Sequence, residues 1–277
     1  MRWVTEDLKA RGADSPRLEA ELLLGQALGC DRIALIVERD RLVEGEPLAR
    51  FRALVQRRRK AEPVAYLRGQ REFFGRSFRV DRRVLVPRPD TETLVEVTLQ
   101  RTQDRSLFAR VLDLCTGSGN VAITLARERP TWQVLGTDLS ADALGVARDN
   151  AVALGALWNV SFAQGDLFAA VQPQARFEVI TANAPYIPTA DIEALAPEIR
   201  DHEPRIALDG GRDGLQVIRR LVPQARAHLA PCGLLALEIQ LDQAEAVSAL
   251  LQQHGYEQIA TTRDLGGRPR VVSALNA

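Results

Sequence analysis

The sequence predicts an α/β protein in which a small helical bundle precedes a mostly parallel sheet covered by helices on both faces. Before residue 70, apolar residues recur at helical spacing. From residue 107 onward, short apolar runs alternate with helix-length segments, as in successive β-α-β units. The charge changes between the two parts: residues 1–83 hold 19 basic and 13 acidic residues, and residues 84–277 hold 17 and 23. The chain therefore divides near residue 80.

The first 70 residues are predicted to form the helical unit. Ser15 and Pro16 read as an N-cap followed by a proline at the first helical position, and Gly29 can end that helix. A later segment places apolar residues on one helix face between residues 48 and 55, and it runs into the basic stretch 57–60. We interpret the basic stretch as a solvated helix end, which the helix dipole favours.

The remaining segments predict a linker and seven strands. Residues 72–86 alternate apolar and polar side chains, which predicts a β-hairpin within a linker at 71–86, followed by a domain at 87–277. Five strand-like runs separated by helix-length segments lie at residues 111–114, 134–137, 160–163, 179–182 and 234–239. A closing pair is predicted at residues 256–262 and 270–274.

Composition excludes several function classes. The 36 basic and 36 acidic residues balance, whereas a nucleic-acid-binding domain is usually basic. The three cysteines and three histidines are scattered, so we predict no metal site. Lys9 and Lys60 are the only lysines and lie away from any glycine-rich turn, which excludes phosphate-loop and Schiff-base chemistry. No apolar run approaches the roughly 20 residues of a membrane helix, and no signal peptide is expected.

Three of the predicted strands end in residues suited to a nucleotide-like ligand. The run from Asp113 to Asn120 contains Gly117 and Gly119, which let the backbone approach a ligand, although many such turns serve only helix–strand packing. Asp138 can accept hydrogen bonds from both hydroxyls of a ribose; the alternative role of helix cap suits Ser140 better. Asp166 could bind an adenine amino group, and it could equally be a turn residue.

A fourth strand end carries the segment Asn183-Ala184-Pro185-Tyr186. The side-chain oxygen of Asn183 and the backbone carbonyl of Ala184 can both accept hydrogen bonds from one planar NH2 group. Tyr186 would pack beside that group. This combination predicts a clamp for an amino or amide nitrogen.

Together, the acid–glycine turn, Asp138, Asp166 and the Asn-x-Pro-Tyr segment resemble class I S-adenosylmethionine-dependent methyltransferases that act on amino groups. Residues 62–75, 86–92 and 203–215 are further similar to the HemK/PrmC family over the whole chain. The resemblance implies a Rossmann-like, mostly parallel seven-stranded sheet and a cytoplasmic protein. It also implies methylation of the side-chain amide nitrogen (N5) of the glutamine in the Gly-Gly-Gln motif of peptide chain release factors, which modulates translation termination.

The resemblance also implies roles for individual residues. Ala184, Pro185 and Tyr186 would act with Asn183 in catalysis, and no metal is implied. The S-adenosylmethionine site would comprise Asp113, Cys115, Thr116, Gly117, Ser118, Gly119, Asp138, Asp166, Leu167 and Asn183. Three positions depart from the family pattern: Ala184 replaces a usual proline, and Cys115 and Gln240 replace common glycines. Because the carbonyl at 184 is retained, we expect a looser clamp and not an inactive one.

Two alternatives remain open from the sequence. The same clamp suits the exocyclic NH2 of adenine or cytosine in DNA, but the acidic second half argues against a DNA cleft. The second alternative is a protein that binds the cofactor or the release factor but has reduced turnover. Cofactor binding without methyl transfer would favour this alternative. We expect the N-terminal bundle to help recognise the release factor, with no stable binding to nucleic acid or membranes.

Overall fold

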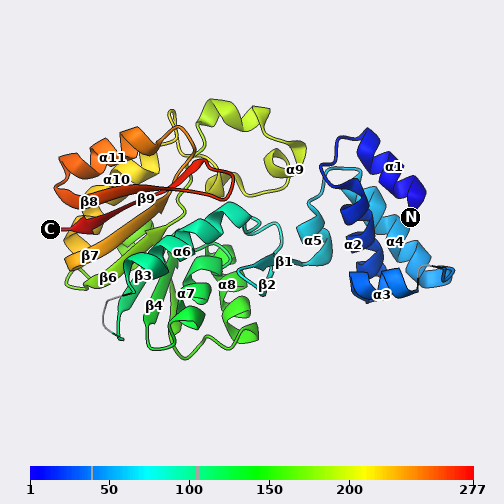
Figure 1. Cartoon of the computed structure of the whole chain (residues 1–277), viewed down its shortest axis with the longest axis horizontal. Coiled ribbons are helices and arrows are strands. Elements are labelled where there is room, and N and C mark those ends of the chain that lie inside the picture. The colour runs from blue at the N-terminus through cyan, green and yellow to red at the C-terminus, as the bar shows by residue number, and fades with distance from the viewer. Residues whose placement is uncertain (39, 104–106) are drawn as a thin grey trace.

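The computed structural model describes residues 1–38, 40–103 and 107–277, and it confirms a helical part followed by an α/β part (Figure 1). The helical part occupies one end of the elongated molecule and the sheet the other. Within the described residues, no helix is long and apolar enough to span a membrane. The helices of the first part are α1 (Arg2–Ala10), α2 (Pro16–Leu28), α3 (Arg32–Val37), α4 (Gly45–Arg58) and α5 (Val64–Arg68).

The first part has its own core, formed where α1, α2 and α4 meet. Helix α2 begins at Pro16 and ends at Gly29, whose φ of 69° lies in the left-handed region that glycine tolerates, as predicted. Leu18, in the first turn of α2, is 38% exposed and lies outside this core. The core side chains are Val4, Leu8, Ala20, Leu23, Leu24, Ala27, Phe51, Val55 and Leu67.

The interpretation of the basic stretch at 57–60 as a solvated helix end holds for Arg57, whose side chain is 53% exposed in the last turn of α4, but it is wrong for Arg58 and Arg59. Arg57 pairs with Glu62 at 2.5 Å, and Arg59 pairs with Asp7 at 2.8 Å. The side chain of Arg58 is only 10% exposed and pairs with Glu19 at 2.7 Å and with Glu198 of the α/β part at 2.8 Å. The stretch therefore holds the helical part together and joins it to the α/β part.

A β-hairpin connects the two parts and is packed firmly against the second. It consists of β1 (Gln70–Phe73) and β2 (Arg76–Arg79), so it begins just before the predicted range of 72–86 and ends well before residue 86. Phe73 and Phe78 are buried in the same core as one face of the large sheet. The buried Asn150 accepts a hydrogen bond from the Arg79 amide at 2.7 Å and donates one to its carbonyl at 3.1 Å.

In the described part of the chain, the large sheet has seven strands, in the order β5-β4-β3-β6-β7-β9-β8. The first five strands are parallel, and β9 pairs antiparallel with both β7 and β8. Every predicted strand is confirmed. The strands are β3 (Arg110–Leu114), β4 (Gln133–Asp138), β5 (Val160–Gln164), β6 (Phe177–Ala182), β7 (Leu229–Glu238), β8 (Tyr256–Arg263) and β9 (Pro269–Asn276).

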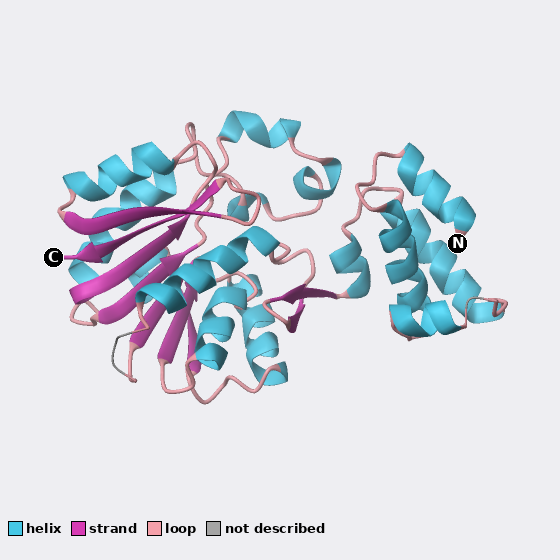
Figure 2. Cartoon of the chain, viewed as in Figure 1, coloured by secondary structure: helices cyan, strands magenta, loops and turns pink. Residues whose placement is uncertain are grey.

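Helices cover both faces of this sheet (Figure 2). Side chains of β3 alternate between two cores: Val111 packs with α6 (Glu92–Arg101), α7 (Asn120–Glu128) and α8 (Ala141–Ala153), whereas Leu112 packs with α10 (Gln216–His228) and α11 (Ala244–Gln253). The chain runs outward from β3 to β5 and then returns to β6 on the other side of β3. Ligands bind beyond the carboxyl ends of strands at such a reversal.

Candidate active site

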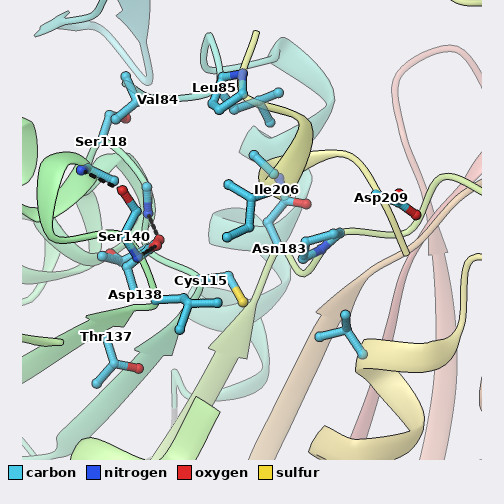
Figure 3. Close-up of a pocket in the computed structure, with 18 of the residues that line it drawn as sticks. Val84, Leu85, Cys115, Ser118, Thr137, Asp138, Ser140, Asn183, Ile206 and Asp209 are labelled. Carbon is cyan, nitrogen blue, oxygen red and sulfur yellow. Dashed lines mark hydrogen bonds between the residues drawn. The ribbon is translucent and has the colours of Figure 1, made fainter. Parts of the chain in front are cut away.

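A cavity of about 630 Å³ lies at the carboxyl ends of the parallel strands. Its floor is the turn after β3 together with the ends of β4 and β6. Val84 and Leu85 border it at the top of Figure 3, where Asp138 lies on one side and Asn183 and Ile206 lie on the other. Residues predicted after four separate strands, β3, β4, β5 and β6, therefore line the same cavity.

The turn after β3 is strongly bent. Cys115, Gly117 and Gly119 have φ values of 57°, 54° and 78°, all in the left-handed region. A Cβ at Gly119 would lie 2.9 Å from Cδ1 of Ile123, so this glycine allows α7 to pack closely on the turn. A Cβ at Gly117 would meet no atom within 4 Å, because that side of the turn faces open space.

The conformation at Cys115 explains why glycine suits this position. We expect Cys115→Gly to change the free energy of unfolding by less than about 1 kcal/mol, because relief of strain is offset by a more flexible unfolded chain. Cys115→Val should cost about 1–3 kcal/mol, since a β-branched residue tolerates this φ poorly. Urea unfolding of both variants measures the difference. Equal stability of the two variants would contradict this account of residue 115.

Asp113 lies beneath the turn and is 1% exposed. Its carboxylate accepts hydrogen bonds from the Thr116 hydroxyl at 2.6 Å and from the Thr181 hydroxyl of β6 at 2.7 Å. Burial raises the pKa of Asp113 to about 6, against the effect of the two hydroxyl groups. Because both oxygens are engaged, Asp113 holds the turn against β6.

Asp138 ends β4 and joins two segments of the cavity wall. One carboxylate oxygen accepts the Gly117 amide at 2.9 Å, and the other accepts the Ser140 amide at 2.9 Å. Ser140 caps α8 by accepting the Ala143 amide at 3.1 Å, as predicted. Burial raises the pKa of Asp138, while the backbone amides oppose the rise. Each oxygen retains a further lone pair that can accept from a ligand hydroxyl.

The residues after β5 form the next part of the wall. Asp166 and Leu167 both line the cavity, and Leu167 is 6% exposed with a φ of 51°. Asp166 is half-exposed and pairs with Arg220 of α10 at 2.5 Å. Leu167 therefore provides a buried apolar surface beside an acid that is already partly neutralised.

Asn183 follows β6 and faces the opposite side of the cavity (Figure 3). Its side-chain nitrogen donates a hydrogen bond to the Thr91 hydroxyl at 3.2 Å, which leaves the side-chain oxygen for a ligand. Ala184 is buried, and no described residue donates a hydrogen bond to its carbonyl. Two acceptors are therefore available at this point of the chain.

Tyr186 is not among the residues that line the cavity. Its hydroxyl donates to Glu238 of β7 at 3.3 Å, and burial raises its pKa. The Tyr186 carbonyl accepts a hydrogen bond from the side chain of Gln243 at 2.9 Å, and the oxygen of that side chain accepts the Gln240 amide at 3.1 Å. Tyr186 therefore anchors the predicted clamp segment to β7 and does not face the cavity.

Two glycines hold the clamp segment in place, a role that the sequence pattern did not reveal. A Cβ at Gly210 would lie 2.8 Å from the Pro185 carbonyl oxygen, and one at Gly214 would lie 2.2 Å from that of Tyr186. The Ile187 carbonyl also accepts the Gly210 amide at 2.8 Å. Because any larger residue would collide with these carbonyl oxygens, positions 210 and 214 require glycine.

Sequence reasoning also missed Thr91, Glu203 and Glu238 as parts of the site. Glu203 is buried, pairs with Arg88 and accepts the Val86 amide at 3.2 Å, so it joins two segments that cover the cavity. These contacts link residues more than 90 positions apart in the chain. Thr91 and Glu203 lie within the family-like segments 86–92 and 203–215, whereas Glu238 lies outside all of the family-like segments.

The site fits S-adenosylmethionine. Its volume lies in the range of ligand pockets, and Asp138 can accept from two hydroxyls. Four aspartates and four arginines line the cavity, so the fit rests on its volume and on the two acceptor oxygens of Asp138 and not on net charge. Among the described residues, no group of three or more histidine, cysteine or acidic side chains is placed to hold a metal ion.

Comparison with known proteins is consistent with this site. Residues 1–69 match the PrmC N-terminal domain model, and residues 111–202 match a methyltransferase domain model. The chain is similar to the release factor glutamine methyltransferases of Geobacter sulfurreducens (44% identity, covering 98% of this chain and 93% of the relative) and Rhodopirellula baltica (40%, covering 100% and 95%).

Solved structures support the fold. A methyltransferase from Pyrococcus furiosus superposes with a TM-score of 0.55 at 17% identity, covering 82% of this chain and 98% of that one. A 16S rRNA methyltransferase of Thermus thermophilus, in complex with AdoMet and guanosine, gives a TM-score of 0.54 at 19% identity, covering 75% and 50%. On these sequence matches, the chain belongs to the release factor glutamine methyltransferase family.

Proposed function

We propose that this chain transfers a methyl group from S-adenosylmethionine to the side-chain amide nitrogen of the glutamine in the Gly-Gly-Gln motif of a release factor. One observation carries the proposal: the free side-chain oxygen of Asn183 follows β6 and borders a cavity that Asp138 also lines, and the free carbonyl of Ala184 lies between the lining residues Asn183 and Pro185. The two oxygens match the two N–H donors of a primary amide.

The chemistry requires mainly positioning. The cofactor supplies an electrophilic methyl group on a sulfonium. The Asn183 side-chain oxygen and the Ala184 carbonyl would accept hydrogen bonds from the two N–H groups of the substrate amide, which would increase the electron density on its nitrogen and fix the direction of the nitrogen lone pair. Asp138 and the turn at 115–119 would hold the cofactor, and Asp166 and Leu167 would bind its adenine. Holding two reactants at near-attack distance can contribute most of the rate enhancement of such a displacement.

Incubation with labelled S-adenosylmethionine and an intact release factor tests the proposal. We expect one methyl group on the glutamine of the Gly-Gly-Gln motif, located by peptide mass mapping. A release factor with alanine in place of that glutamine is the control and should remain unlabelled. Label transferred to DNA instead would favour the base-methylating alternative, and cofactor binding without any transfer would favour a protein that has lost turnover.

We further propose that residues 1–70 recognise the release factor, with 71–86 as the linker and 87–277 as the catalytic domain in the cytoplasm. The first part has a separate core, and it joins the α/β part through the Arg58–Glu198 pair. The balance of acidic and basic residues supports the absence of stable nucleic-acid binding.

Removal of residues 1–61 should spare cofactor binding and lower methylation of intact release factor at least tenfold. The cut leaves Tyr66, whose hydroxyl donates to the Val84 carbonyl at 2.6 Å beside the cavity. A short Gly-Gly-Gln peptide, which makes no contact outside the cavity, should lose much less activity. Rates on both substrates and cofactor titration calorimetry measure these effects. An equal loss on peptide and intact protein would show that the helical part only supports the fold.

A further inference from the structure

A short helical turn of the α/β part lies against the end of α4. It comprises α9 (Pro197–Arg200) and the residues up to Glu203, whose amide donates to the Ile199 carbonyl at 3.0 Å and so continues the turn. Figure 1 places α9 on the side of the α/β part that faces the helical part. Residues four positions apart in such a turn share one face, and here that pair is Glu198 and His202.

Both members of this pair contact the end of α4. The Glu198 carboxylate pairs with the Arg58 guanidinium at 2.8 Å, and Arg58 is also held by Glu19 within the helical part at 2.7 Å. The His202 ring contacts the Lys60 carbonyl through Nε2 at 2.9 Å. Because a carbonyl can only accept, the ring nitrogen donates in this contact. The shared face of the turn is therefore fixed to the helical part at two points.

The residue after His202 contacts the wall of the active-site cavity. Glu203 is buried, pairs with Arg88 and accepts the Val86 amide at 3.2 Å. The chain then runs directly into residues 204–207, all of which line the cavity, and Ile206 among them lies on the same side as Asn183 (Figure 3). Residues 197–207, the bridge segment, are therefore fixed to the helical part at one end and form part of the cavity wall at the other.

We propose that Glu198 and His202 are positioning residues for the methylation of an intact release factor, because they hold the helical part at a fixed place relative to the cavity. The proposal rests on the proposed function, in which the helical part recognises the release factor while the glutamine enters the cavity. A substrate bound at two places reaches the second one efficiently only if their separation is fixed. Neither Glu198 nor His202 lines the cavity, so their effect passes through the bridge segment.

Loss of these two contacts would leave both parts folded and joined. The covalent connection runs elsewhere, through α5 and β1, and Tyr66 of α5 donates to the Val84 carbonyl at 2.6 Å. The side chains of Glu198 and His202 are both partly exposed, so their removal opens no buried cavity. Only the orientation of the helical part relative to the cavity would be freed. The effect should therefore depend on whether the substrate is large enough to contact both parts.

The test measures kcat/KM of full-length variants for an intact release factor and for a short Gly-Gly-Gln peptide. In Glu198→Ala/His202→Ala, we expect the release factor value to fall about tenfold, while the peptide value and the cofactor Kd stay within about twofold. Glu198→Gln/His202→Gln keeps an acceptor for Arg58 and a donor for the Lys60 carbonyl, so it should lose less than about threefold. The control is Asp201→Ala, which removes an exposed acid of the same turn that pairs with the adjacent Arg200 at 2.7 Å, and which should change none of the three values.

The difference between the two substrates separates positioning from support of the fold. Equal losses on release factor and peptide in the alanine variant would assign Glu198 and His202 to support of the fold and overturn the proposal. An unchanged release factor value in that variant would overturn it as well. So would a glutamine variant that loses as much as the alanine variant, because the retained contacts would then have no effect. Failure of the proposed function itself would appear separately, as absent methyl transfer by the unchanged chain.

Discussion

Asn183→Ala is expected to lower kcat for release factor methylation by about 10²–10³-fold, the scale of losing one preorganised polar group at a reacting centre. The reason is geometric. The side-chain oxygen of Asn183 is free because the nitrogen is engaged by Thr91 at 3.2 Å. Its removal leaves the Ala184 carbonyl as a single acceptor, which can bind the amide nitrogen without fixing the direction of its lone pair.

Cofactor titration calorimetry and single-turnover rates check this expectation. The cofactor Kd should stay within a few-fold, because Asp138, which we propose holds the ribose, lies on the other side of the cavity (Figure 3). Asn276→Ala is the control: its side chain donates to the Leu229 carbonyl at the start of β7, the opposite end of the sheet. Turnover close to normal in Asn183→Ala would refute the clamp.

The sequence was sufficient to predict the sheet. The parallel strands are buried on both faces and therefore appear as short apolar runs, such as Val111–Leu114 and Val179–Ala182, which propensity and spacing reveal directly. The β-hairpin was also predicted, but its packing against the α/β part was not. Whether Phe73 and Phe78 lie in solvent or against α6 depends on a tertiary contact that local alternation does not encode.

The candidate site could be predicted only in part, for a similar reason. Residues such as Asp138 and Asn183 follow strands, and the carboxyl ends of parallel strands share one edge, so local position was enough to group them. Thr91 and Glu203 are single polar residues whose hydrogen-bond partners lie far along the chain. The same holds for Arg58, whose partners Glu19 and Glu198 give no local signal.

Asp138→Ala is expected to divide its effects in the opposite way from Asn183→Ala: weaker cofactor binding, with turnover largely restored at saturating cofactor. Loss of hydrogen bonds to a charged acceptor costs about 2 kcal/mol, or roughly a thirtyfold rise in Kd. The substitution also removes the acceptor for the Gly117 and Ser140 amides, so the turn and the start of α8 would lose a common partner.

Two further variants separate these contributions to the effect of Asp138→Ala. Asp138→Asn retains one acceptor oxygen and the side-chain shape, so it should preserve more of the turn while still weakening the pair of ribose contacts. Asp142→Ala removes an exposed acid from the first turn of α8 and should leave the cofactor Kd unchanged. Calorimetry on the three variants, with urea unfolding in parallel, distinguishes binding from stability. The contrary outcome is that Asp138→Ala lowers the stability yet binds the cofactor with normal affinity. In that case the Asp138 carboxylate would only stabilise the turn, and the ribose would bind elsewhere in the cavity.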